Sequence, residues 1–367
     1  MNPLLALQKE GQSVWLDFIT RSFIAQGKLK QLIDNDGLRG VTSNPTIFQK
    51  AFAGGADYDA SIRALGQKGL DSSAVFETLA VEDIQKACDA FAGVYQATQG
   101  TDGFVSIEVN PHLARDTKGT LNEARRLHNA VNRPNVMVKI PATVEGLPAI
   151  QQALSEGISI NVTLIFSLER YQQVMDAWLA GLEGAAKAGK PLAPIASVAS
   201  FFVSRVDVLV DGQLEKRKPA GWESLRGKAA IANAQQAYAM FEKARASDRF
   251  KALAAKGAHS QRPLWASTST KNPAYRDVLY VETLIGSETV NTLPLATIDA
   301  FRDHGQVRKA LPTAEGAATL TALKAAGIDM GAVGKQLEDD GVKLFMASYD
   351  ELIKSLEAKR DALKVGA

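Results

Sequence analysis

The chain has 367 residues, 46% of them hydrophobic, which is enough to bury a large core and excludes a disordered or collagen-like chain. Its 42 basic and 40 acidic residues leave a formal charge of +2, which predicts neither a nucleic-acid footprint nor a membrane-seeking surface. A single cysteine, Cys88, excludes an internal disulfide framework and a multi-cysteine zinc site.

Neither a secretory signal nor a membrane segment is indicated. The stretch MNPLLALQKEGQ has a short apolar run and no basic region before it, and no run of about 20 apolar residues follows. Together with the single cysteine, which fits a reducing compartment, this predicts a soluble cytoplasmic protein.

Short apolar, β-branched runs alternate with longer stretches of helical spacing, which is typical of parallel strands joined by crossover helices. The eight runs are SVWLDF (13–18), GVTSN (40–44), FVSIEV (104–109), VMVKIP (136–141), SINVTLIF (159–166), IASVASFF (195–202), PLWAST (263–268) and TVNTLP (289–294). The expected helices are GKLKQLIDNDG, the region 61–99, TLNEARRLHNAVN, GLPAIQQALSEG, SLERYQQVMDAWLAGLEGAAKAGK, KAAIANAQQAYAMFEKARAS and NPAYRDVLYVETLIG. Residues 206–228 are expected to form an excursion from the sheet.

The chain is predicted to be one domain over 1–367. No linker or internal repeat divides it, and residues 295–367 contain helical segments expected to pack on the outside of the sheet.

Polar residues at the strand ends decide between two α/β architectures, an open doubly wound sheet and a (β/α)8 TIM barrel. They are Asp17, Asn44, Glu108, Lys139, Asn161 with Thr163, Ser200, Ser267, and Asn291 with Thr292. An open sheet needs polar side chains only at its switch point, whereas the carboxyl ends of all barrel strands converge on one site. The pattern therefore favours the barrel.

Lys139 stands inside an apolar run that reads as a strand buried on both faces. A strand lysine commonly reaches solvent or pairs with a carboxylate. Burial, however, lowers the pKa of an amine from about 10.4, and a neutral amine can attack a ketone to form a Schiff base. We therefore predict a nucleophilic lysine.

Two strand carboxylates, Asp17 and Glu108, are candidates for the proton transfers that such chemistry needs. Either could instead simply neutralise Lys139 as an ion-pair partner. Two acids and one amine in one site make catalysis the stronger interpretation.

Further polar residues fit substrate contacts. Thr163 and Ser200 could position water or hydroxyl groups, and Asn44 and Asn161 could bind sugar oxygens, although Asn44 in SNPT also fits a helix cap. Arg205 could bind a phosphate or form a salt bridge with Asp207, and the residues alone leave that choice open.

No metal or cofactor is predicted. The histidines at 112, 128, 259 and 304 lie far apart in the sequence without paired ligand spacing. No GxxxxGK[ST] or strand-linked GxGxxG motif occurs.

The segments VTSNPTIF, VSIEVNP, VMVKIPAT, INVTLIFS and SFFVSRVD together resemble the strand-end signatures of the transaldolase family, in order and spacing over about residues 10–300. The resemblance implies a cofactor-free barrel of the class I aldolase type. Such an enzyme transfers a dihydroxyacetone unit from sedoheptulose 7-phosphate or fructose 6-phosphate to glyceraldehyde 3-phosphate or erythrose 4-phosphate. Its partners would be these small sugar phosphates, and it would be a monomer or a homodimer.

The resemblance also implies a role for each matched residue. Lys139 would be the Schiff-base nucleophile, Asp17 the acid/base for C–C cleavage, and Glu108 with Thr163 would handle the catalytic water. Asn44, Asn161 and Ser200 would bind the dihydroxyacetone portion. Arg205 would bind the phosphate.

The seventh strand departs from the better-known members, which end it with Ser-x-Arg. Here WASTSTKNP places Ser269 after Ser267 where the arginine would fall, and this form resembles a longer-chain subgroup. Lys271 could replace the charge, or Ser269 could donate a neutral hydrogen bond. Ser267, Ser269 and Lys271 are therefore candidate substrate-binding residues.

Two other functions remain open at this point. One is a lyase resembling fructose-6-phosphate aldolase, which releases dihydroxyacetone to water; Phe202 speaks against it, because those aldolases use a phenol there to manage water. The other is a non-catalytic barrel that binds sugar phosphates.

Overall fold

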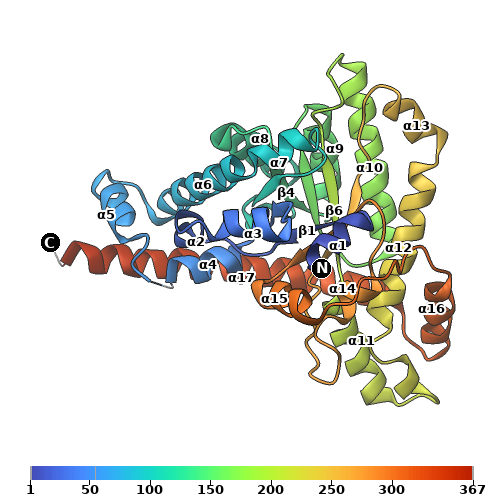
Figure 1. Ribbon diagram of the computed structural model, residues 1–367. Helices are drawn as coiled ribbons and strands as arrows, with labels where there is room; N and C mark the ends of the chain where they lie inside the picture. The colour runs from blue at the N-terminus through green and yellow to red at the C-terminus, as the bar shows by residue number, and fades with distance from the viewer. Residues whose placement is uncertain (1, 54, 366–367) are drawn as a thin grey trace.

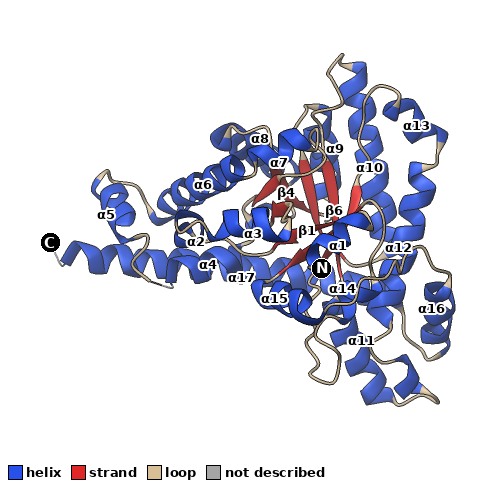
Figure 2. Ribbon diagram, viewed as in Figure 1, coloured by secondary structure: helices blue, strands red, loops and turns tan. Residues whose placement is uncertain are grey.

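A computed structural model describes residues 2–53 and 55–365, and its centre is a closed barrel of eight parallel strands in the order β1 to β8 (Figures 1 and 2). The predicted (β/α)8 barrel is therefore confirmed. The strands are β1 (Gln12–Leu16), β2 (Gly40–Val41), β3 (Phe104–Glu108), β4 (Val136–Pro141), β5 (Ile160–Ile165), β6 (Ser197–Phe202), β7 (Arg262–Ala266) and β8 (Thr289–Leu293).

Each strand overlaps the apolar run that predicted it, and β4 matches its run at both ends. The β2 strand has only two residues, and a helix begins at Pro45. At Gly40 a side chain has no room, since a Cβ there would lie 2.6 Å from the Trp15 ring and 2.8 Å from the Phe104 carbonyl oxygen. The glycine thus lets β1, β2 and β3 pair closely.

Helices surround the barrel on its outside (Figure 2). Up to β6 they are α1 (Pro3–Lys9), α2 (Arg21–Ala25), α3 (Lys28–Asp36), α4 (Pro45–Ala53), α5 (Asp59–Gln67), α6 (Ser72–Ala90), α7 (Ala92–Ala97), η1 (Pro111–Leu113), α8 (Thr117–Val131), α9 (Gly146–Ser155) and α10 (Leu168–Lys187). After β6 they are α11 (Ser204–Arg217), η2 (Trp222–Leu225), α12 (Ala229–Arg245), α13 (Asp248–Ala254), α14 (Leu279–Thr283), α15 (Leu295–His304), α16 (Glu315–Ala325) and α17 (Met330–Val365). None of the helices described is long and apolar enough to span a membrane.

One local prediction differs from the structure. The expected helix NPAYRDVLYVETLIG is helical only over α14, because the Asn272 side chain accepts a hydrogen bond from the Ala274 N–H and closes a turn there. The region 206–228 lies outside the strands, as expected of an excursion. It contains most of α11, which starts directly after β6 and so places Arg205 in its first turn.

The long helix α17 does more than cover the outside of the barrel. It packs against α4, α5, α6 and α11, and also against β5. Figure 1 shows it as the long red helix running from the barrel past α4 to α5. Leu344, Phe345 and Ser348 of this helix line the cavity at the carboxyl ends of the strands. The C-terminal helix therefore forms part of the barrel mouth.

Candidate active site

A cavity of about 380 Å³ opens where the carboxyl ends of the strands converge. Of the eleven residues predicted for the site, nine line it: Asp17, Asn44, Lys139, Thr163, Ser200, Arg205, Ser267, Ser269 and Lys271. Glu108 and Asn161 do not line it but contact residues that do. The barrel thus brings together side chains that are up to 254 residues apart in the chain, from 17 to 271.

Lys139 lies on β4 with only 6% of its side chain exposed, so the solvent-reaching alternative is wrong. Its Nζ lies 3.1 Å from Oε2 of Glu108, donates to the Ser43 carbonyl oxygen at 3.1 Å, and lies 5.6 Å from the centre of the Phe345 ring. Glu108 and Lys139 meet because they are direct partners in the β3–β4 register. The amine is therefore buried beside one carboxylate at the floor of the cavity.

Glu108 has the properties of a proton acceptor for that amine. Its side chain is 4% exposed, and burial raises its pKa, although the Lys139 charge acts in the opposite direction. A carboxylate that is poorly solvated takes a proton readily, and the amine at 3.1 Å can supply one. Glu108 is thus placed to accept a proton from this amine.

Asp17 follows β1 directly and faces the same cavity. Burial raises its pKa, while Lys139 and the Thr42 hydroxyl favour its charged form. Thr42 donates to Oδ1 of Asp17 at 2.8 Å, so the 2.6 Å bond between Thr42 and Thr292 must have Thr292 as its donor. This hydroxyl relay orients the Asp17 carboxylate.

Thr163 on β5 is fully buried, and its Oγ1 has no hydrogen-bond partner among the described residues. The strand is irregular here: its register with β6 shifts between Val162 and Ile165, and Leu164 has a positive φ of 60°. The irregularity leaves the Thr163 hydroxyl lining the same cavity as Lys139. A free buried hydroxyl of this kind can hold a water or a substrate oxygen.

The side-chain amides of Asn161 and Asn44 have different surroundings. Asn161 donates to Ser106 Oγ at 3.0 Å and accepts from Ser200 Oγ at 2.7 Å, so both ends of its side chain are engaged below the cavity. Asn44 accepts from the Ile47 N–H at 3.0 Å and thereby caps the start of α4, as its alternative interpretation predicted. Asn44 still lines the cavity, and its side-chain nitrogen remains able to donate.

Three basic side chains besides Lys139 line the cavity: Arg205, Lys271 and Lys50. Arg205 lies over the Phe202 ring at 5.2 Å and has no ion pair among the described residues. Burial lowers the pKa values of Arg205 and Lys271, and for Lys271 the Arg205 charge adds to the effect. Such a concentration of positive charge suits a phosphate group.

The salt bridge between Arg205 and Asp207 that the sequence left open is wrong. The Asp207 carboxylate is instead buried and accepts from the Ala230 N–H at 2.8 Å and the Tyr280 hydroxyl at 2.7 Å. The two candidates for the second phosphate contact lie next to each other, because the Lys271 Nζ donates to Ser269 Oγ at 2.8 Å. Ser267 bonds the Ser204 hydroxyl at 2.9 Å and so ties β7 to the start of α11.

Several cavity residues were missed by the sequence analysis. Thr42 lay inside a predicted run and could have been found as a strand-end hydroxyl. Lys50, Phe345 and Ser348 carry no such signal, because they lie on helices whose position over the mouth depends on tertiary packing.

Comparisons with known proteins show the family of the chain. The family model for transaldolase/fructose-6-phosphate aldolase matches residues 14–356. The chain is 52% identical to a transaldolase of Saccharopolyspora erythraea over 364 residues, which cover 98% of each chain. It is 49% identical to one of Mycolicibacterium smegmatis over 99% of each chain, and 52% identical to one of Thermobifida fusca over 96% of each. The chain therefore belongs to the transaldolase/fructose-6-phosphate aldolase family.

Proposed function

We propose that this protein is a transaldolase that transfers a dihydroxyacetone unit between sugar phosphates through a Schiff base on Lys139. The observation that carries the proposal is the buried Lys139 amine, 3.1 Å from the Glu108 carboxylate, in the floor of a cavity that also holds Asp17 and three basic side chains. Relatives about 50% identical over nearly the whole chain, each named transaldolase, support it.

The first half of the reaction makes the covalent intermediate. The Lys139 amine, having given its proton to Glu108, attacks the C2 ketone of the donor and forms a carbinolamine. Loss of water from this adduct requires a proton on the departing hydroxyl, which Glu108 can return, with the Thr163 hydroxyl holding the water. The product is an iminium ion between Nζ and C2.

The second half exchanges the carbon fragments. Asp17 takes the proton of the C4 hydroxyl, the C3–C4 bond breaks, and its electron pair moves into the iminium to give an enamine and a free aldehyde. The enamine then attacks the acceptor aldehyde, and Asp17 returns the proton to the new alkoxide. Water attack on the iminium finally releases the ketose and restores the amine.

The cationic side of the cavity fits the phosphate of donor and acceptor. Arg205 would provide the main contact, with Lys271 and its partner Ser269 next to it. Ser200 and Asn44 would bind hydroxyl groups of the dihydroxyacetone portion, and Asn161 would act by orienting Ser200.

Release of free dihydroxyacetone to water is the alternative activity within the family. Phe202 in the cavity wall supplies a ring without a hydroxyl, and it packs against Phe166 with ring centres 5.0 Å apart. This apolar wall offers no group to activate water near the enamine, which favours transfer. Fructose 6-phosphate turnover should therefore depend on added erythrose 4-phosphate, and strong turnover without an acceptor would favour the lyase.

Borohydride trapping tests the covalent step. Reduction with fructose 6-phosphate present should add a stable mass to the peptide that contains Lys139, and Lys139→Ala should abolish both the adduct and transfer while the protein stays folded. Binding of fructose 6-phosphate without any adduct would instead indicate a non-catalytic binding barrel. Loss of folded protein in Lys139→Ala would indicate a structural lysine.

A further inference from the structure

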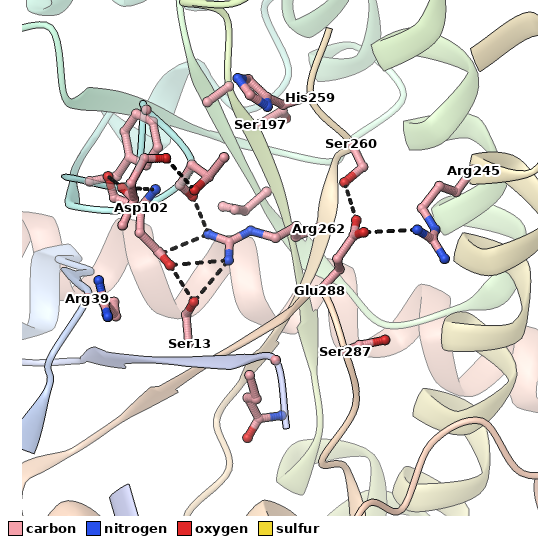
Figure 3. A pocket seen from close by; sticks show the side chains of 18 of the residues that line it. Ser13, Arg39, Asp102, Ser197, Arg245, His259, Ser260, Arg262, Ser287 and Glu288 are labelled. Atoms are coloured by element: carbon pink, nitrogen blue, oxygen red, sulfur yellow. Dashed lines mark hydrogen bonds and ion pairs between the residues drawn. The ribbon is translucent and has the colours of Figure 1, made fainter. Parts of the chain in front are cut away.

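A second and larger cavity, of about 650 Å³, lies at the opposite end of the barrel, where the strands begin (Figure 3). It is lined by Gln12 and Ser13 of β1, Ser197 of β6, Arg262 of β7, and Glu288 directly before β8. Its volume lies within the range of small-molecule sites. No residue of the proposed catalytic site lines it.

Two arginines of this cavity are neutralised within the protein. Arg262 lies 2.9 Å from Oδ1 of Asp102 and also donates to Ser13 Oγ, and Figure 3 shows these three side chains joined. Arg245 pairs with Glu288 at 2.9 Å on the other side. Each of these two arginines is therefore balanced by a carboxylate of the cavity lining.

Arg39 is different, because it forms no ion pair among the described residues. Its Nη2 donates to the neutral Gln8 amide oxygen at 2.8 Å. Asp102, an acidic side chain of the same cavity, already accepts from Ser13, Trp15 and Arg262. The cavity lining therefore has one arginine more than it has carboxylates, and that arginine can bind an oxyanion with two parallel hydrogen bonds.

The backbone holds Arg39 in place. Its N–H donates to the Val14 carbonyl oxygen at 2.8 Å, and its own carbonyl accepts from the Gly103 N–H at 2.7 Å. The residue directly precedes β2, so its Cα is fixed by the barrel and only the side chain can adjust. Because its Cα is held in place, Arg39 loses less conformational entropy when it binds an anion.

An unpartnered acceptor points independently to a ligand. Gln12 is fully buried and lines this cavity, and its Oε1 has no hydrogen-bond partner within the described part of the chain. Its Nε2 donates to the Leu284 carbonyl oxygen at 2.9 Å. Because that carbonyl can only accept, the orientation of the amide is fixed and Oε1 needs a donor from elsewhere. A hydroxyl group of a ligand would supply it.

We propose that this cavity at the amino ends of the strands, the lower cavity, is a binding site for a small hydroxylated organic anion. Its phosphate or carboxylate would bind Arg39, and a hydroxyl would bind Gln12 Oε1. The apolar side chains of Phe104, Met137 and Phe250 line the rest of the cavity and would contact the carbon skeleton. This site is separate from the proposed transfer reaction, so either can fail without the other.

Calorimetric titration of Arg205→Ala tests the proposal. In this variant the proposed phosphate site at the carboxyl ends of the strands, here called the upper cavity, is weakened. Glycerol 3-phosphate and D-glycerate are the two probes, which differ in the anionic group, and glycerol is the neutral control. One of the anions should bind with a stoichiometry near one, and Arg39→Gln in the same background should weaken it by about tenfold or more. Arg39→Lys should lie between the two, since it retains the charge without the planar fork.

The proposal is overturned if neither anion binds Arg205→Ala at millimolar concentration, or if Arg39→Gln leaves the affinity unchanged. Transfer by Arg39→Gln with Arg205 intact should equal that of the unaltered protein. Hydrogen exchange of the unaltered protein covers the case in which Arg39→Gln does not fold. The bound anion should slow exchange in the peptides that contain Gln12 and Arg39, and protection confined to the upper cavity would also overturn the proposal.

Discussion

Asp17 illustrates how a residue with a proposed catalytic role can carry a cost in stability. Its carboxylate contacts a favourable donor, Thr42, and lies within reach of the charges of Lys139 and Arg205, yet burial still raises its pKa. The charged form of Asp17 is therefore less stable in the folded protein than it is in water.

Asp17→Asn should separate the two effects. A carboxyl with a raised pKa contributes stability that is fully present below its ordinary pKa and is lost as pH rises through the raised value. At pH 7.5 the neutral amide avoids this loss, so the melting temperature should rise by about 1–3 °C. Transfer should fall by roughly 10²- to 10⁴-fold because the base is missing. Scanning calorimetry and a coupled assay measure both.

Asp71→Asn is the matched control, since Asp71 caps α6 at the surface and Asn caps a helix equally well. Neither its melting temperature nor its activity should change. A lower melting temperature for Asp17→Asn would contradict the account.

The basic residues of the upper cavity should act on substrate binding. Arg205→Ala should raise KM for fructose 6-phosphate by about 10- to 100-fold, and Lys271→Ala and Lys50→Ala by about 2- to 10-fold each, with kcat changed less than about threefold. Steady-state kinetics on each variant measure this. Lys30→Ala, at an exposed pair with Asp34, is the control. A fall in kcat at constant KM would argue against phosphate binding.

At the scale of elements, α17 is the segment that completes the site. It crosses the end of β5 with two glycines that lie on one face of the helix, seven residues apart. A Cβ on Gly334 would lie 2.6 Å from the Ser167 Cβ, and one on Gly341 would lie 2.9 Å from Leu164. Leu164, which lies at the second of these contacts, is the residue with the positive φ. The glycines thus let the helix approach closely enough to place Phe345 near Lys139.

Gly334→Ala should push α17 away from the barrel. We expect unfolding stability to fall by about 1–3 kcal/mol and kcat to fall severalfold, since Phe345 then shields Lys139 less well. Urea denaturation and the transfer assay measure these. Gly93→Ala, in α7 where a Cβ meets nothing within 4 Å, should instead raise stability by up to about 1 kcal/mol. If both variants changed stability and kcat in the same way, Gly334 would not be needed for the close contact between α17 and the barrel.

At the scale of the whole molecule, buried carboxyls influence how stability depends on pH. Burial raises the pKa of Asp207 to about 6, although hydrogen bonds from the Ala230 N–H and the Tyr280 hydroxyl oppose the shift. This carboxyl joins α11, α12 and α14. Its protonation state therefore affects the packing of the helices that follow β6.

The free energy of unfolding should fall as pH rises from about 4 to about 6. Asp207 contributes stability that is complete below its ordinary pKa and is lost as pH passes its raised pKa, and about 1–3 kcal/mol should disappear. Urea denaturation across this range measures the slope, and Asp207→Asn should flatten it relative to the unaltered protein. Asp34→Asn, at an exposed site, should keep the slope. A slope identical in Asp207→Asn would contradict the assignment.

The sequence by itself determined the barrel and most of its polar mouth. Parallel strands buried on both faces require continuous apolar runs, so a lysine or carboxylate inside such a run is conspicuous, and its place at the strand end directs it to the common mouth. Lys139, Asp17 and Glu108 could be identified for that reason. The cap at Asn44 was likewise visible in local chemistry.

Only the tertiary structure decided which distant segments meet. The Thr42–Thr292 bond joins residues 250 positions apart, and α17 brings Phe345 to Lys139 across 206 residues of chain. The surplus charge of Arg39 likewise appears only after Asp102 has paired with Arg262. Such contacts depend on the packing of whole helices and on the closure of the barrel, and no local pattern of residues records either one.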